Sequence, residues 1–173
     1  MKISIPPICL VLLVGPSGSG KSTFAARHFS PTEIVSSDRC RALISDDETN
    51  QHVSADAFEL LHLIVDKRLK YGRLAVVDAT NLQCRARRPL IEQAEKYDCP
   101  LIAIVFDYPT AVYHAHNKAR HGRRVPPEII EKHVRELSQA ILSLEGEGVA
   151  ETYRLRTPHE AQRVEVVRPQ IAP

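Results

Sequence analysis

The chain has 173 residues, which is enough for one domain with a substantial core. Its hydrophobic fraction of 43% and charged fraction of 25% are ordinary for a globular protein, and no apolar run approaches the ~20 residues that a membrane span needs. The net charge of +2 is too small to indicate nucleic-acid binding by itself, so any basic surface must be local.

The four cysteines, at positions 9, 40, 84 and 99, show no C-x-x-C spacing and therefore predict neither a zinc ribbon nor a redox pair. Reduced thiols and a cytoplasmic location fit this pattern best. The apolar run 8–14 after Lys2 imitates a short signal peptide, but it leads directly into a glycine-rich loop that cleavage would destroy. We interpret this run as a buried strand.

Strand and helix patterns alternate along the chain, which predicts an α/β fold with a central parallel sheet flanked by helices. Strands are expected at 8–14, 33–36, 74–78, 101–106, 151–155 and 163–167. Helices are expected after residue 23, at 55–71 with Ser54 as its cap, at 85–96, at 110–120, and from Pro127 onward. The proline-flanked segment 169–173 indicates the start of a linker to a further domain, so the domain is predicted to span 1–168.

The first predicted strand ends in a glycine-rich loop of the pattern G-x-x-x-x-G-K-[ST], and a helix pattern follows it. This order predicts a site for the phosphates of a nucleoside triphosphate, because glycines and a helix N-terminus turn backbone N–H groups toward one anion. We expect Lys21 to reach the β- and γ-phosphates in a solvent-open site, and Ser22 to ligate Mg²⁺ directly. The predicted nucleotide-binding residues of the loop are Gly15, Ser17, Gly18, Ser19, Gly20, Lys21, Ser22 and Thr23.

The sequence lacks residues that are typical of two common classes of phosphate-loop protein, the GTPases and the ATPases of the AAA type. Asn117-Lys118-Ala119 is followed by Arg120, whereas a GTPase needs an aspartate at that place to read guanine. The third predicted strand ends in Asp78 followed by Ala79, whereas ATPases of the AAA type usually have a second acidic residue that activates water. The sequence therefore favours phosphoryl transfer to an acceptor over hydrolysis.

Acidic residues stand at the carboxyl ends of two of the predicted strands. Asp38 comes just after the second strand, where open α/β sheets build their sites, and is placed to accept a proton from an acceptor hydroxyl. Arg41, one helical turn later, pairs with Asp38 or holds an acceptor phosphate. The alternative is that Asp38 only caps a helix, with Arg41 on a solvated face. Asp78 is expected to hold the metal through water or to hydrogen-bond Ser22, and its alternative is a buried carboxylate that caps the next helix.

The segment 120–127, Arg-His-Gly-Arg-Arg-Val-Pro-Pro, predicts a hinged basic lid. Arg123 is the expected arginine finger on the γ-phosphate. The alternatives are a solvated basic loop or a nucleic-acid patch. The eight histidines lack metal-ligand spacing, and we interpret all of them as structural or solvated.

With the phosphate loop, S-S-D-x-x-R at 36–41, V-V-D-A-T-N at 76–81 and the lid in this order, the chain resembles 5′-hydroxyl polynucleotide kinases. It looks most like the N-terminal kinase domains of bacterial polynucleotide kinase-phosphatases of RNA end healing and sealing. The resemblance implies a P-loop kinase fold with a helical lid. It also implies transfer of the γ-phosphate of ATP or another NTP, with Mg²⁺ or Mn²⁺, to 5′-OH ends of RNA or DNA. The roles that it assigns are phosphate and metal binding for Lys21 and Ser22, general base for Asp38, orientation of base and acceptor for Arg41, lid finger for Arg123, nucleobase contact for Arg120 and acceptor contact for Gln51.

Members of that family also carry a phosphatase, and the bacterial repair enzyme a ligase-type module, but this sequence contains neither D-x-D-x-T nor K-x-D-G. We therefore expect covalently linked phosphatase and ligase domains in a longer protein. Two other functions stay open. One is a small-molecule kinase of the same fold, which would use the same loop, base and lid. The other is a non-catalytic nucleotide-binding module, for which a damaged base or lid would be expected.

Overall fold

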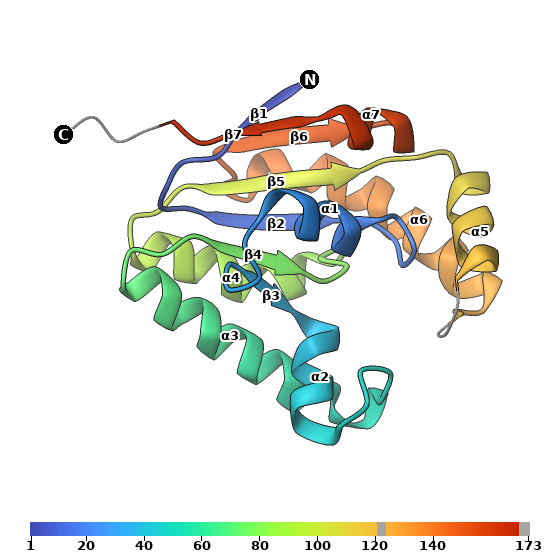
Figure 1. The fold of residues 1–173 in the computed structure, drawn as a ribbon, viewed down its shortest axis with the longest axis horizontal. Helices are drawn as coiled ribbons and strands as arrows, with labels where there is room; N and C mark the ends of the chain where they lie inside the picture. The colour runs from blue at the N-terminus through green and yellow to red at the C-terminus, as the bar shows by residue number, and fades with distance from the viewer. Residues whose placement is uncertain (121–123, 170–173) are drawn as a thin grey trace.

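The computed structural model describes residues 1–120 and 124–169. Its centre is a five-stranded parallel sheet with the strand order β3-β4-β2-β5-β6. The strands are β2 (Leu10–Val14), β3 (Ile34–Ser36), β4 (Ala75–Asp78), β5 (Leu101–Phe106) and β6 (Glu151–Leu155). Their carboxyl ends point to one side of the molecule, on the right in Figure 1. The predicted parallel α/β sheet is therefore confirmed.

The central strands of this sheet are covered on both faces. Every residue of β2, β4 and β5 is buried, which explains why these strands read as continuous apolar runs without polar alternation. Leu12 of β2 pairs with Val77 of β4 on one side and with Ala103 of β5 on the other. The strand that leads into the glycine-rich loop is thus the middle strand of the sheet.

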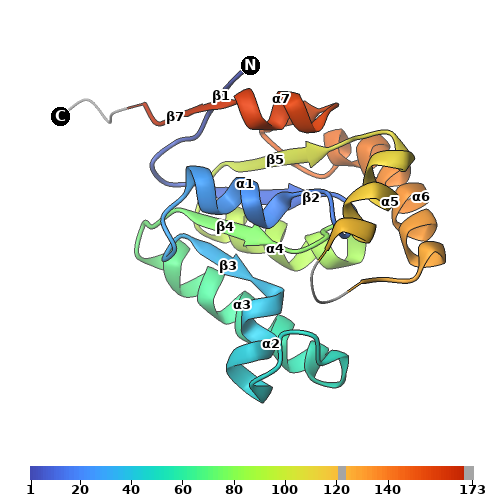
Figure 2. The same cartoon turned by 45° about the vertical axis from the view of Figure 1, so that its right-hand side comes forward.

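Helices flank the sheet on both faces. In the described ranges they are α1 (Lys21–His28), α2 (Ser37–Ser45), α3 (Ser54–Lys70), α4 (Cys84–Lys96), α5 (Thr110–Ala119), α6 (Pro127–Ser143) and α7 (Pro158–Arg163), with 3-10 turns η1 (Gln51–Val53) and η2 (Leu144–Gly146). Figures 1 and 2 show α1 on one face of the sheet and α4 on the other. The pair α2–α3 and the pair α5–α6 stand on either side of the carboxyl ends of the strands (Figure 2). None of the helices described is both long enough and apolar enough to cross a lipid bilayer.

Four elements differ from the prediction. Helix α2 was not among the expected helices and begins directly at the end of β3. Residues 158–163 form α7, because the Thr157 hydroxyl accepts a hydrogen bond from the Glu160 N–H and Pro158 fits the first turn of a helix. Strand β7 is consequently only Glu165–Val167, and it pairs in parallel with β1 (Lys2–Ser4), a strand that the sequence analysis missed.

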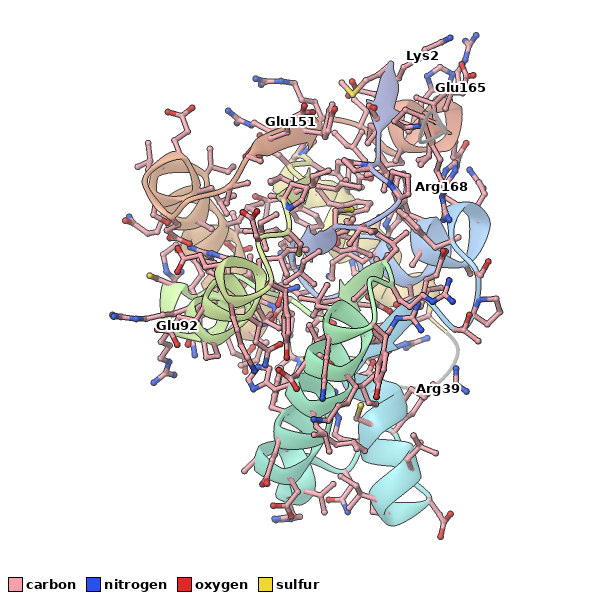
Figure 3. All side chains as sticks on the ribbon, turned by 90° about the vertical axis from the view of Figure 1, so that its left-hand side faces the viewer. Lys2, Arg39, Glu92, Glu151, Glu165 and Arg168 are labelled. Atoms are coloured by element: carbon pink, nitrogen blue, oxygen red, sulfur yellow. The ribbon has the colours of Figure 1, made fainter. Side chains whose placement is uncertain are left out.

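The N-terminal strand β1 and the C-terminal strand β7 contact each other, and the residues after β7 contact the rest of the domain. Lys2 Nζ lies 3.5 Å from Glu165 Oε2 across the β1–β7 pair. Figure 3 labels both residues in a view from the side opposite to the carboxyl ends of the strands. Arg168 donates two hydrogen bonds of 2.7 Å to the Glu33 carboxylate, which holds the pKa of that carboxyl below its ordinary value. The small sheet therefore closes the fold at the end far from the carboxyl ends of the strands.

A buried arginine fixes the start of α4. Arg87 is fully buried and donates to both carboxylate oxygens of Glu147, at 2.7 and 2.5 Å. It also donates to the carbonyls of Asn81 and Leu82, at 2.9 and 2.7 Å. Because these carbonyls lie in the loop after β4, the network supports the backbone next to Asp78.

Candidate phosphate-loop site

A cavity of about 860 Å³ opens at the carboxyl ends of the strands. Its wall is made by the glycine-rich loop, by the start of α2 with η1 and α3, and by α5, α6 and α7. The predicted site residues that line it are Ser17, Gly18, Ser19, Gly20, Lys21, Ser22, Thr23, Asp38, Arg41, Gln51, Asp78 and Arg120. One cavity therefore brings together residues that are far apart in the sequence.

The glycine-rich loop runs from the end of β2 to the first residue of α1. Gly18 and Gly20 have φ angles of +80° and +89°, a region that favours glycine. Gly15 does not line the cavity, but a Cβ at this position would meet Phe106 Cβ and Ser19 Oγ at 3.0 Å, so the backbone approaches β5 too closely for a larger residue. These constraints explain the glycine positions of the motif in this chain.

Lys21 departs from the solvent-open position that we expected, because its side chain is buried at the centre of the loop. Its Nζ donates to the carbonyls of Gly15 and Pro16, at 2.8 and 2.7 Å, and to Ser19 Oγ at 3.2 Å. Burial lowers the pKa of Lys21 to about 8, although the carboxylate of Asp78 acts in the opposite direction. The ammonium group thus sits among loop oxygens, at the position where the motif needs a cation.

Asp78, at the end of β4, is a buried carboxyl group that hydrogen-bonds the Ser22 hydroxyl. Burial raises the pKa of Asp78, while the Ser22 hydrogen bond and the charge of Lys21 lower it. The expected contact between Ser22 and Asp78 is therefore present. A hydroxyl and a carboxylate side by side are hard oxygen donors, so their chemistry fits Mg²⁺ or Mn²⁺.

Asp38 and Arg41 lie in the first turns of α2 and form an ion pair. The side chain of Arg41 is only 7% exposed and that of Asp38 is 45% exposed. Arg41 Nε also donates to the Glu48 carbonyl at 2.9 Å. The helix cap is Ser36, whose hydroxyl accepts from the Arg39 N–H. The alternative that Asp38 only caps the helix, with a solvated Arg41, is therefore wrong.

The opposite wall contributes Arg120, whose Nη1 donates to Ser17 Oγ at 3.2 Å. Arg120 directly follows α5 and begins the predicted lid, and Arg123 lies outside the described residues. Asn117, in the last turn of α5, and Val125 exchange two hydrogen bonds of 2.9 and 3.0 Å, which join α5 to the later part of the segment 120–127. The base of the segment is thus closed by a buried asparagine that the sequence analysis did not single out for this role.

Gln51, in η1, lines the cavity with its side chain exposed, and its Nε2 donates to the Thr49 carbonyl at 3.1 Å. Ser54 is not the cap that we predicted for α3, because the cap position is Val53. Its Oγ is instead buried in the cavity wall and has no hydrogen-bond partner within the described part of the chain. The cavity wall thus includes the hydroxyl of Ser54, which the sequence analysis expected to cap α3.

Two histidines make structural contacts to the backbone of the glycine-rich loop, and the sequence analysis did not single out either of them. His116 Nδ1 of α5 lies 2.9 Å from the Gly18 carbonyl oxygen. The Ser17 N–H donates to His133 Nδ1 of α6 at 3.3 Å. Both side chains line the cavity. No local motif marks these residues, because they meet the loop only through the packing of α5 beside α6.

A protein-family model described as an AAA domain matches residues 10–142, which is most of the chain. No curated protein matches the sequence. A chain in the solved structure of the Pnkp1/Rnl/Hen1 RNA repair complex is 26% identical, with a TM-score of 0.68. The match covers 80% of this chain but only 47% of that one, so our chain spans about half the length of this relative.

Solved small-molecule kinases share the fold over their whole length. A sugar kinase from Janibacter sp. is 19% identical with a TM-score of 0.61, and the match covers 91% of this chain and 92% of the kinase. Shikimate kinase from Acinetobacter baumannii is 17% identical with a TM-score of 0.54, covering 90% and 88%. These likenesses show the P-loop kinase fold, as predicted. The match to the RNA repair complex confirms the resemblance that the motifs indicated.

Proposed function

Starting from the fact that this chain belongs to the AAA domain family, we propose that it is a polynucleotide 5′-hydroxyl kinase. It transfers the γ-phosphate of ATP or another NTP to 5′-OH ends of RNA or DNA. The observation that carries the proposal is that Lys21 and the phosphate loop line the same cavity as the Asp38–Arg41 pair. Strand β4 ends in a single acidic residue, Asp78, which is followed by Ala79, and this supports transfer over hydrolysis in this family member.

The donor half of the reaction belongs to the phosphate loop. Its backbone N–H groups and the N-terminus of α1 bind the β- and γ-phosphates, and Lys21 adds a positive charge. Ser22 would hold a divalent metal directly and Asp78 through water. Such a metal supplies positive charge that neutralises the phosphate oxygens. Arg120 lies beside Ser17 at the entrance, where it contacts the nucleotide, and Arg123 is the proposed finger on the γ-phosphate.

The acceptor half belongs to α2 and η1. Arg41 holds the carboxylate of Asp38 by an ion pair, and a carboxylate has further lone pairs that can take a proton. In the proposed step the 5′-oxygen forms a bond to the γ-phosphorus, the bond from that phosphorus to the β–γ bridging oxygen breaks, and the hydroxyl proton passes to Asp38. The products are a 5′-phosphate end and a nucleoside diphosphate. Gln51 contacts the acceptor end from η1.

The choice of a polynucleotide acceptor rests on the match to the RNA repair complex, which is closer in sequence than the matches to the sugar and shikimate kinases named above. The half-length match also supports the proposal that residues 1–168 are the kinase domain of a longer protein. Linked phosphatase and ligase domains in that protein are what the resemblance to polynucleotide kinase-phosphatases implies. The rival is a small-molecule kinase, favoured by the end-to-end match to a sugar kinase. The two differ in the acceptor alone.

A labelling experiment separates these functions. The protein is incubated with γ-labelled ATP, Mg²⁺ and RNA or DNA oligonucleotides that carry either a 5′-OH or a 5′-phosphate, and in parallel with sugars, sugar acids and shikimate. We expect label on the 5′-OH strands only. Label on a small acceptor with none on oligonucleotides would establish the rival. ATP binding without any transfer would establish a non-catalytic module.

The role of Asp38 gives a first prediction. Asp38→Asn should lower the transfer rate at saturating ATP by ~10²-fold or more, the usual scale for a general base. The affinity for ATP should change little, because Asp38 faces the acceptor. Asp46→Asn is the matched control, since it makes the same chemical change at the other end of α2 and outside the cavity. A variant that lost ATP binding but kept its turnover rate would show that the assignment is wrong.

A further inference from the structure

Two peptide groups of the phosphate loop are held from outside by His116 and His133. A carbonyl oxygen only accepts, so the 2.9 Å contact between His116 Nδ1 and Gly18 O requires a proton on that nitrogen. A backbone N–H only donates, so the 3.3 Å contact from Ser17 N requires a lone pair on His133 Nδ1. His116 therefore donates a hydrogen bond to the loop, whereas His133 accepts one from the neighbouring residue.

The direction of each peptide group follows from these contacts. In a planar trans peptide the C=O and the N–H point in opposite directions. Because the Gly18 carbonyl points outward to His116, the N–H of Ser19 points to the inside of the loop, where it reaches the Pro16 carbonyl at 3.3 Å. Because the Ser17 N–H points outward to His133, the Pro16 carbonyl points inward, where Lys21 Nζ donates to it at 2.7 Å.

Rotation of either peptide group would reverse these polarities. A turned Gly18–Ser19 group would present a carbonyl oxygen to the interior and withdraw an N–H donor, which is unfavourable for an anion. Glycine at position 18, with its φ of +80°, gives the backbone the freedom to make such a rotation. A specific contact is therefore needed to keep one orientation, and the hydrogen bond from His116 supplies it.

We propose that His116 and His133 are positioning residues for triphosphate binding: His116 keeps the Ser19 N–H directed into the phosphate loop, and His133 keeps the Pro16 carbonyl directed at Lys21. Neither side chain needs to touch the reacting atoms for this role. The inference rests on the proposed function only in that the loop binds a nucleoside triphosphate, and it is independent of the acceptor.

The test measures the affinity for ATP with Mg²⁺ by calorimetry, and KM and kcat by single-substrate titration. His116→Ala should weaken ATP binding by ~3- to 10-fold, the range of one net hydrogen bond. KM for ATP should rise by a similar factor, while kcat at saturating ATP changes less.

Replacement of His116 by Asn or Asp tests whether a hydrogen-bond donor is what the loop needs. His116→Asn should restore binding, because its amide N–H₂ can donate from the position of Nδ1. His116→Asp is of equal size but has no donor when ionised, so it should not restore binding. His133→Asn, with an acceptor oxygen at the same place, should likewise outperform His133→Ala.

His114 is the matched control on the same helix. Its Nε2 lies 2.7 Å from Glu131 Oε1 of α6, and it does not line the cavity. His114→Ala should leave the affinity for ATP unchanged. An equal loss in this variant, or equal affinities of His116→Asn and His116→Asp, would show that helix packing alone is responsible and overturn the proposal. If an alanine variant fails to fold, the comparison of ATP affinity between His116→Asn and His116→Asp still tests the proposal. A wild type that binds ATP but does not phosphorylate oligonucleotides would refute the proposed acceptor without affecting this inference.

Discussion

At the residue scale, the buried ammonium of Lys21 makes ATP binding sensitive to pH. Burial lowers the pKa of Lys21 to about 8 in the folded protein, from an ordinary value of 10.5. Protonated Lys21 therefore lowers the stability of the fold below pH 8, and this cost disappears as the pH rises through the folded and then the unfolded pKa. The triphosphate prefers the protonated form, so the affinity for ATP should fall as the pH rises from 7 to above 8.

Proton uptake is the direct measurement of this prediction. Calorimetry at pH 8 in two buffers of different ionisation enthalpy should show that ATP binding takes up a fraction of a proton, because a bound polyanion favours the charged lysine. Lys21→Gln should bind ATP weakly and take up none. Equal proton uptake by this variant would assign the effect to another group.

Arg123 gives a prediction about the transition state. If it contacts the γ-phosphate mainly as charge shifts during transfer, Arg123→Ala should lower the single-turnover rate far more than the affinity for ATP, by ~10³-fold on the scale of related fingers. Arg123→Lys should rescue poorly, because an ammonium lacks the planar set of donors. Arg120→Ala and Arg124→Ala serve as comparisons. Small and equal losses of oligonucleotide affinity at all three positions would favour a general nucleic-acid patch instead.

The sequence predicted the residues whose positions follow from short-range rules. Lys21 and Ser22 belong to one motif, Asp38 follows β3 and Asp78 ends β4, so the parallel sheet brings them to the same edge. His116 and His133 could not be found in this way, because their role depends on how α5 and α6 pack beside the loop. The burial of Lys21 was also missed, since a motif specifies which groups meet but not how much solvent reaches them.

At the element scale, Arg87 connects α4 to the turn after α6, and its removal should destabilise the fold. Arg87→Ala removes the charged partner of Glu147, whose side chain is only 11% exposed, and breaking such a largely buried pair typically costs about 3–5 kcal/mol. Arg88→Ala is the control on the next residue, because the Arg88–Glu92 pair is exposed and such pairs contribute about 1 kcal/mol or less. Chemical denaturation at pH 7 measures both. Equal effects of the two variants would contradict the assigned role of Arg87.

The same pair predicts a dependence on pH. Arg87 lowers the pKa of Glu147 below its ordinary value, so the stabilisation is present above the unfolded pKa and is lost as the pH falls through the folded one. The difference in unfolding free energy between wild type and Glu147→Gln should therefore shrink in acid. Unfolding curves between pH 7 and pH 3 test this.

Elements with a strong apolar pattern were predictable, and short elements were not. Strands β2 and β5 are fully buried and appear as apolar runs, and α6 begins at Pro127 as expected. Strand β1 has only three residues and exists because β7 pairs with it, which no local pattern reveals. Helix α7 was missed although Thr157 and Pro158 are ordinary signals of a helix start.

At the scale of the whole molecule, occupation of the cavity should raise the unfolding temperature. A ligand at 100 times its Kd adds about 2.7 kcal/mol to stability, which is about 5–10 °C for a chain of this size. ATP with Mg²⁺ should produce such a shift in a thermal unfolding experiment. ATP with excess chelator should produce a smaller one, since Ser22 and Asp78 would then lack the metal. An identical shift with and without the metal would argue against their role as its ligands.

The strand order also determines when the phosphate loop can form as the chain leaves the ribosome. Strand β2 is synthesised first among the five, but its neighbours β4 and β5 begin only at residues 75 and 101. Until then the apolar segment 10–14 has no partner strand, and the loop that follows it has no fixed shape. A nascent chain must therefore keep this segment away from other molecules until at least the residues through Asp78 have been made, and a chaperone would find it most accessible during that time. Strand β1 precedes the other strands in the sequence, but it cannot form its pair until β7, which begins at residue 165, has been made.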